Sequence, residues 1–303
     1  MNIEVVVEGL QFPEGPVVMN DGSLLFVEIK RQTLTRLTSD GAVEVVAELG
    51  GGPNGAAIGP DGAAYVCNNG GFEWHDAGGI LIPGHKPDWY VSGSIQRVDL
   101  ETGAVTTLYD SCDGQPLAGP NDIVFDKTGN FWFSDHGKSD ARGRVHGALY
   151  YAQADGSQIT RVRPELLSPN GVGLSPEEDV LYFADTVTGR LWAIDLDAPG
   201  VAAPPPQPWL AGRVIATLPG FQLLDSLKVE QDGRVCVGTL VNGGVTVFQT
   251  DGVHEHIAFP DISITNIVFG GDDMQTVWAT GSSTGRIYKT RWPRPGLKLN
   301  YYA

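Results

Sequence analysis

The sequence predicts an all-β fold, a six-bladed β-propeller with four-stranded blades. The first observation is a unit that recurs six times along the 303 residues: a polar residue, a short apolar strand, a tight turn and a second apolar strand. Self-similarity at this scale is typical of repeat architectures. The second is the chemistry of the turns, which contain pairs such as Asp21-Gly22 and Asp61-Gly62 that suit β-hairpins. The third is a further hairpin in each unit, and radial repetition of four-stranded sheets makes a propeller.

The six units begin at comparable points. A residue with a side-chain oxygen precedes the first strand of every unit, at Glu14, Asn54, Asn121, Asn170, Asp225 and Asn266. In a propeller the starts of the innermost strands meet at one end of the central channel. We therefore expect these oxygens to converge, and hard oxygen donors suit Ca²⁺ or Mn²⁺. Asn54 and Asn266 are interpreted as structural, because an Asn side chain can cap the loop that enters a strand.

The N-terminal segment is expected to close the ring. Residues 3–7 form a strand that belongs to no complete unit, whereas the last unit, from Asn266 to about Trp292, shows only three strands. Pairing of these two segments would remove open sheet edges. Because the repeat runs through almost the whole chain, we predict a single domain over residues 1–303.

The second unit is interrupted between Asn69 and Gly93 by a segment rich in glycine and aromatic residues that has no clear strand pattern. Long irregular insertions in compact domains often act as lids over a site. The candidates for the wall of a substrate pocket are Trp74, His75, Trp89 and Tyr90. The alternative is a loop packed on the rim. A polar segment from His136 to His146 is expected to form another loop.

Composition excludes several classes of function. A net charge of -16 argues against nucleic-acid binding, since nothing would neutralise phosphates. The three cysteines lack the spacing of a zinc site, and Cys67 and Cys236 fall in apolar strands. The N-terminus lacks the features of a signal peptide and no run is apolar enough to cross a membrane, so we predict a cytoplasmic protein without a membrane partner. The sequence indicates no oligomeric state.

Five short motifs resemble those of a known family. They are Phe12-Pro13-Glu14-Gly15-Pro16, Pro120-Asn121-Asp122, Ser168-Pro169-Asn170-Gly171, Asp225-Ser226-Leu227 and Thr265-Asn266-Ile267-Val268-Phe269-Gly270-Gly271. With these motifs the chain resembles the regucalcin/gluconolactonase family of six-bladed propellers over nearly its whole length. More distantly, its layout is similar to that of diisopropyl fluorophosphatase and paraoxonase.

The resemblance implies one divalent metal ion (Ca, Zn, Mn or Mg) at the mouth of the channel, held by Glu14, Asn170 and Asp225. An Asn at the position of Asn121 also ligates in the related calcium phosphotriesterases, and in gluconolactonases it lies beside the metal and can contact substrate or water. The family usually hydrolyses a lactone, a cyclic ester. The implied mechanism is a metal that polarises the lactone carbonyl and lowers the pKa of the attacking water.

Several residues are candidates for the general base that this reaction needs. Asp225 is the first, because a carboxylate beside a metal can accept a proton from water. His136 is the second, since imidazole titrates near neutral pH, and His75 and His146 follow. The Gly-x-Ser-x-Gly pattern at Gly281–Gly285 is not interpreted as a nucleophile, because a strand rather than a helix follows it.

One departure from the family bears on the substrate. Sugar-lactone members have an Arg two residues before the Asn of the third unit, where this chain has Gly119. That Arg holds a sugar hydroxyl, so its absence and the aromatic insertion favour a less polar lactone. Two alternatives remain open, because the fold alone does not decide function: a non-catalytic calcium-binding or scaffold propeller, and a phosphotriesterase-like hydrolase.

Overall fold

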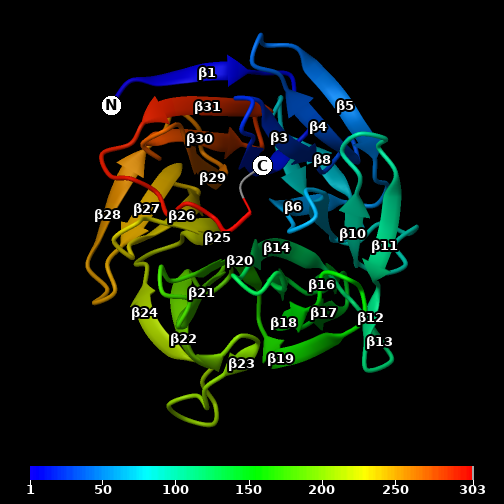
Figure 1. Cartoon of the computed structure of the whole chain (residues 1–303), viewed down its shortest axis with the longest axis vertical. Coiled ribbons are helices and arrows are strands. Elements are labelled where there is room, and N and C mark those ends of the chain that lie inside the picture. Colours follow the sequence, from blue (N-terminus) through cyan, green and yellow to red (C-terminus); the bar gives the residue numbers. More distant parts are fainter. Residues whose placement is uncertain (302–303) are drawn as a thin grey trace.

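Six sheets surround a central channel in the computed structural model of the chain (Figure 1). The structure describes residues 1–301; the last two residues of the predicted domain, 302 and 303, lie outside the described residues. Within residues 1–301 there is no α-helix. The prediction of an all-β, six-bladed propeller is therefore confirmed. No helix long and apolar enough to cross a membrane occurs in this part of the chain.

Each blade is numbered in chain order, and in every blade the first strand named here is the innermost. Blade 1 contains β2 (Pro13–Val18), β3 (Leu24–Glu28), β4 (Thr33–Leu37) and β5 (Val43–Glu48), and blade 2 contains β6 (Pro53–Ile58), β7 (Ala64–Asn68), β10 (Ser94–Val98) and β11 (Val105–Tyr109). Blade 3 contains β14 (Pro120–Phe125), β15 (Phe131–Asp135), β18 (Gly147–Ala152) and β19 (Ile159–Leu166), and blade 4 contains β20 (Pro169–Leu174), β21 (Val180–Asp185), β22 (Arg190–Ala198) and β24 (Arg213–Thr217), with the short β23 (Val201–Ala202) beside β22. Blade 5 contains β25 (Leu223–Val229), β26 (Val235–Leu240), β27 (Gly244–Phe248) and β28 (His254–Ala258), and blade 6 contains β29 (Ile264–Gly270), β30 (Thr276–Gly281), β31 (Arg286–Arg291) and β1 (Ile3–Val7).

The N-terminal strand closes the ring, as predicted. β1 pairs antiparallel with β31, placing Ile3 opposite Thr290, and Figure 1 shows β1 outside β31. The Thr290 hydroxyl donates a hydrogen bond of 2.7 Å to the carbonyl of Asn2. The last blade is thus completed by the first residues of the chain, which ties the two ends of the repeat together.

The core lies between the blades. Each pair of neighbouring blades in the described chain shares a buried apolar cluster. Between blades 3 and 4, for example, Trp132 packs with Phe183 and Trp192, and the last two rings stack with centroids 5.9 Å apart. Removal of this apolar surface from water is the main force that holds the ring together.

Every inner strand carries a β-bulge where it enters the channel. In blade 2, Pro53 pairs with Asn68 and Ala56 pairs with Val66, so the inner strand has one residue more than its neighbour between the two pairs. The same irregularity occurs in β2, β14, β20, β25 and β29. A bulge changes the direction in which its side chains point and interrupts the ladder. The repeat therefore presents its polar residues toward the channel at one level of the ring.

Both inserted segments form more regular structure than the sequence predicts. The insertion in blade 2 contains a ribbon of β8 (Trp74–Asp76) and β9 (Leu81–Pro83), and the segment in blade 3 contains β16 (Lys138–Asp140) and β17 (Gly143–Val145). A further ribbon in blade 2 pairs β12 (Ser111–Cys112) with β13 (Gln115–Pro116). In the first ribbon Gly78 and Gly79 have φ of 73° and 90°, which permits the tight turn. Three-residue strands are too short to show an alternating pattern, so the prediction of irregular loops was wrong here.

A buried carboxylate anchors the segment that follows the last blade. Glu230 is fully buried and accepts hydrogen bonds from Trp292 Nε1 at 2.7 Å and from Arg294 Nε at 2.5 Å. A β-bridge between Glu230 and Gly296 continues this attachment. From there residues 297–301 cross the end of the channel opposite to the bulges.

We predict that Arg294→Ala lowers the free energy of unfolding by about 3 kcal/mol, because it leaves the buried charge of Glu230 without its cation. Arg291→Ala is a matched control, since its ion pair with Asp273 is exposed and contributes less than about 1 kcal/mol. Urea unfolding of both variants measures the difference. Equal stability of the two variants would contradict the anchoring role of Glu230.

Candidate active site

The bulges place an oxygen-bearing residue at the same point of each blade. These residues directly follow the pairing residues Pro13, Pro53, Pro120, Pro169, Leu224 and Ile264, and are Glu14, Asn54, Asn121, Asn170, Asp225 and Thr265. The sixth is thus Thr265 and not Asn266 as the sequence predicted, because Ile264 pairs with Gly281 and the bulge begins one residue earlier. All of them are buried except Asp225, which is partly exposed.

Two carboxylates lie near each other in this ring. Glu14 is 2% exposed, and its Oε2 accepts hydrogen bonds from Gly15 N at 2.7 Å and from Asn266 Nδ2 at 2.8 Å. Burial raises the pKa of Glu14 to about 7, and the charge of Asp122 acts in the same direction. Asp225 keeps some exposure, yet loss of water followed by the negative charge of Glu14 raises its pKa well above the ordinary value. Two carboxylates that disfavour each other's ionisation are arranged to receive a cation.

Two amides complete the group. Asn170 Nδ2 donates to Thr186 Oγ1 at 3.1 Å, while its Oδ1 has a long contact of 3.4 Å with Ser226 Oγ. Asn121 Oδ1 is buried and has no hydrogen-bond partner within the described residues. A buried carbonyl oxygen without a partner is unfavourable unless water or a cation contacts it.

These residues fit a hard divalent cation. Residues 1–301 contain no group of three or more His, Cys, Asp or Glu side chains placed to hold a metal. The candidate donors are instead two carboxylates, Glu14 and Asp225, with the amide oxygens of Asn121 and Asn170. Oxygen ligands of this kind suit Ca²⁺, Mg²⁺ or Mn²⁺ better than metals that prefer nitrogen or sulfur, and the orphaned oxygen of Asn121 supports the fit.

His136 is poorly suited to act as a base. Its Nδ1 lies 2.9 Å from Arg144 Nη2. Burial, followed by the positive charges of Arg144 and Lys138, lowers the pKa of His136 to about 3. Its imidazole is therefore neutral at pH 7 and a weak proton acceptor. The third candidates, His75 and His146, are both exposed.

The insertion between Asn69 and Gly93 extends across several blades at the end of the channel where the bulges lie. Leu81 N donates to Ser283 O of blade 6 at 2.9 Å, and Lys86 N donates to Ser139 O of blade 3 at 3.0 Å. Trp74 packs on Phe12, two residues before Glu14, with ring centroids 5.0 Å apart. These contacts place the insertion at the bulge end of the channel, against blades 1, 3 and 6, an arrangement that fits both a lid and a loop packed on the rim.

The other aromatic residues of the insertion differ in their surroundings. Trp89 is 54% exposed, and its ring lies over Gly71. The hydroxyl of Tyr90 donates a hydrogen bond to Ala118 O at 2.7 Å, which joins the insertion to the residues that precede β14 of blade 3. The ring of Tyr90 lies against Gly70, with the ammonium of Lys138 5.3 Å from its centroid, so its hydroxyl and ring both hold the insertion in place.

Lys138 attaches the insertion to blade 3, a role that the sequence did not predict. Its ammonium donates to Asn69 O at 2.7 Å and lies 3.9 Å from the centroid of the Phe72 ring. Lys138 is only 5% exposed, and burial lowers its pKa to about 7, although the charge of Asp135 opposes this. A lysine in a polar segment is usually a surface residue, so no sequence signal distinguished it.

The space beside Gly119 is already filled. A Cβ atom at position 119 would lie 2.5 Å from the carbonyl oxygen of Gly137. The segment that contains β16 and β17 thus occupies the place that a larger side chain at 119 would need. A side chain larger than glycine at position 119 would therefore require this segment to move.

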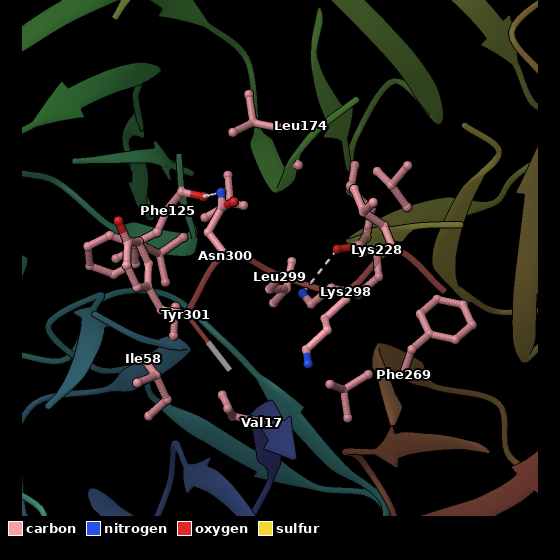
Figure 2. A pocket seen from close by; sticks show the side chains of 18 of the residues that line it. Val17, Ile58, Phe125, Leu174, Lys228, Phe269, Lys298, Leu299, Asn300 and Tyr301 are labelled. Carbon is pink, nitrogen blue, oxygen red and sulfur yellow. Dashed lines mark hydrogen bonds between the residues drawn. The ribbon is translucent and has the colours of Figure 1, made fainter. Parts of the chain in front are cut away.

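A separate apolar cavity lies at the opposite end of the channel. It is lined by later residues of the inner strands, including Val17, Ile58 and Phe125, and by residues 297–301 (Figure 2). Asn300 Nδ2 donates to Phe125 O at 3.2 Å, and Leu297 N donates to Val229 O at 2.9 Å. The C-terminal segment thus forms a wall across this end, and the polar ring is reached from the other side.

We predict that Lys138 makes stability depend on pH. Between pH 7 and its ordinary pKa of 10.5, the unfolded chain binds a proton that the folded protein releases, so the free energy of unfolding rises with pH. Relative to Lys138→Met, the wild type should gain stability across this window, by at most about 1.4 kcal/mol per pH unit. Urea unfolding of both proteins at several pH values measures the gain, and parallel curves would contradict it.

Comparison with known proteins places the chain in a family. The family described as SMP-30/Gluconolactonase/LRE-like region matches residues 12–283. The gluconolactonase of Zymomonas mobilis is 25% identical over 280 residues, which cover 82% of this chain and 70% of that protein. The lactonase drp35 of Staphylococcus saprophyticus is 28% identical over 253 residues, with the same coverage of 82% and 70%. A gluconolactonase structure from Xanthomonas campestris aligns with a TM-score of 0.75 at 22% identity, covering 96% of this chain and 89% of the other. The chain therefore belongs to the SMP-30/gluconolactonase/LRE-like family.

Proposed function

We propose that the protein is a divalent-metal-dependent hydrolase that opens a lactone. The observation that supports the proposal is that Asp225 lies close enough to Glu14 to feel its charge, while Asn121, at the equivalent point of blade 3, has a buried amide oxygen without a hydrogen-bond partner. The relatives from Zymomonas mobilis and Staphylococcus saprophyticus, named as a gluconolactonase and a lactonase, support the choice of reaction.

Glu14, Asn170 and Asp225 would hold the ion, with Asn121 as a fourth ligand or as a contact to substrate. When bound, a divalent ion supplies a Lewis acid that polarises a carbonyl and makes water more acidic. Asn266 keeps Glu14 in place through its hydrogen bond to Oε2. The amide of Asn170 is held in the same way by Thr186.

Asp225 is the proposed proton acceptor. It keeps partial exposure at the mouth, whereas Glu14 is 2% exposed and uses Oε2 for two hydrogen bonds. Water and substrate can therefore reach Asp225 more readily than Glu14. The low pKa of His136 removes the main competitor for this role.

The inserted segments would form the substrate site. Trp74 and Tyr90 offer ring faces, and Trp89 offers an exposed ring near the mouth. The carbonyl of Gly137 fills the space beside Gly119, so no side chain extends from that position to hold a sugar hydroxyl. An aliphatic or aryl lactone suits these surfaces better than an aldonolactone.

A pH-drop assay on a panel of sugar, aliphatic and aryl lactones tests the reaction. We expect turnover that a chelator removes and a divalent ion restores, with preference for the less polar lactones. A preference for gluconolactone would contradict the substrate assignment while leaving the reaction intact. Absence of turnover on every lactone would favour a binding protein over an enzyme.

Variants of the ring test the residue roles. We expect Asp225→Asn to lower kcat by about a thousandfold while circular dichroism shows an intact fold, since both the proton acceptor and a ligand charge are lost. Asn121→Ala should lower kcat/KM, whereas Asn54→Ala, at the equivalent point of the neighbouring blade, serves as the matched control. Wild-type activity of Asp225→Asn in chelated buffer would overturn the proposal.

A further inference from the structure

A lysine side chain lies near the axis of the channel, below the polar ring. The ammonium of Lys228 in blade 5 donates to Leu227 O at 3.0 Å and to Asn266 Oδ1 of blade 6 at 3.4 Å. It also lies 3.8 Å from Asp122 Oδ2 of blade 3. Blades 3 and 6 face each other across a ring of six, so a cation that contacts both must lie close to the axis.

Lys228 separates the polar ring from the apolar cavity. It lines that cavity together with Phe269 and Leu299 (Figure 2). Its ammonium contacts Asn266 and Asp122, which lie outside the cavity lining. Long cationic side chains often bury an apolar stem in this way and direct the charged end to polar surroundings. Lys228 therefore forms the floor of the candidate active site.

Four charged side chains interact at this level of the channel. The charge of Asp122 acts on both Glu14 and Asp225, and these two carboxylates act on one another. The ammonium of Lys228 opposes burial at Asp122, which is 1% exposed. Three carboxylates and one ammonium sum to a formal charge of -2 when all are ionised.

Other buried charges near the ring have partners of their own. Glu28, at the end of β3, forms an ion pair with Arg31 at 3.0 Å. Asp135, at the end of β15, accepts backbone hydrogen bonds from Ala118, Gly119 and Gly137. The charges that act on Glu14, Asp122 and Asp225 come from within the four groups named above.

We infer that Lys228 sets the charge of the channel so that a single divalent cation neutralises it. An uncompensated charge in a buried site is strongly unfavourable, so the charge of the surroundings selects the charge of the ion. With Lys228 the two remaining negative charges match a divalent ion. Without it, three negative charges would favour a trivalent one. This inference rests on the proposed metal site and assigns a residue that controls which ion it accepts.

The test compares Ca²⁺ with Tb³⁺, which binds similar oxygen ligands but carries one more charge. Isothermal titration of the chelator-stripped protein with CaCl₂ and with TbCl₃ gives the ratio of the two affinities. Lys228→Met should raise the ratio in favour of Tb³⁺ by about tenfold or more, because the additional charge of the ion no longer meets the ammonium. Lys228→Arg keeps the charge and should keep the ratio.

Two further variants distinguish an effect of the charge of Lys228 from an effect of its packing. Asp122→Asn should lower the Tb³⁺ preference, and the double variant Lys228→Met with Asp122→Asn should return the ratio to that of the wild type. A merely structural role for Lys228 would weaken both ions alike and leave the ratio unchanged, which would overturn the inference. Wild-type protein that binds neither ion would instead overturn the proposed metal site, and the inference with it.

Discussion

The bulge at the start of each inner strand is the constraint on which the rest of the site depends. It adds one residue to the inner strand of every blade relative to the neighbouring strand, and two consecutive residues share this point of the inner strand. The first carries the oxygen donor. The second is glycine in blades 1, 2 and 4, where a neighbouring backbone approaches closely: a Cβ on Gly171 would lie 2.4 Å from Leu227 N. In blades 3, 5 and 6 it is Asp122, Ser226 or Asn266, and these side chains contact Lys228, Asn170 and Glu14.

The buried charges of the ring lower the stability of the folded protein. Burial raises the pKa of both Glu14 and Asp225; the charge of Glu14 adds to this at Asp225, and the charge of Asp122 adds to it at both, so the ionised pair is costly without a cation. The apolar clusters between the blades hold this arrangement, because their stability does not depend on the axis. Such local conflicts between sequence and environment concentrate at functional sites. The same packing leaves the ring rigid enough to define the positions of its oxygens.

The repeat was predictable because its signals are local: a proline and a polar residue before an apolar strand, then an Asp-Gly turn. Ring closure by residues 3–7 followed from counting strands. The register of the last blade was not predictable, since Thr265 and Asn266 both carry oxygens and only the pairing of Ile264 with Gly281 distinguishes them. Lys228 was missed for another reason, because its neighbours Leu227 and Val229 mark an ordinary strand and its partners come from blades 3 and 6.

The two ends of the channel have different chemistry, and this separates the tasks of the fold. On the far side, residues 297–301 and Lys228 line an apolar cavity. At the bulge end, the repeated ring supplies the ion ligands of the proposed function, whereas the insertions of blades 2 and 3 supply further surfaces beside it. Lys138 joins these two insertions through Asn69, and Gly137 fills the space beside Gly119. The bulges that position the ring oxygens belong to the inner strands, and the insertions do not pair with these strands. Substitutions in the insertions can therefore change the substrate preference while the ring stays the same.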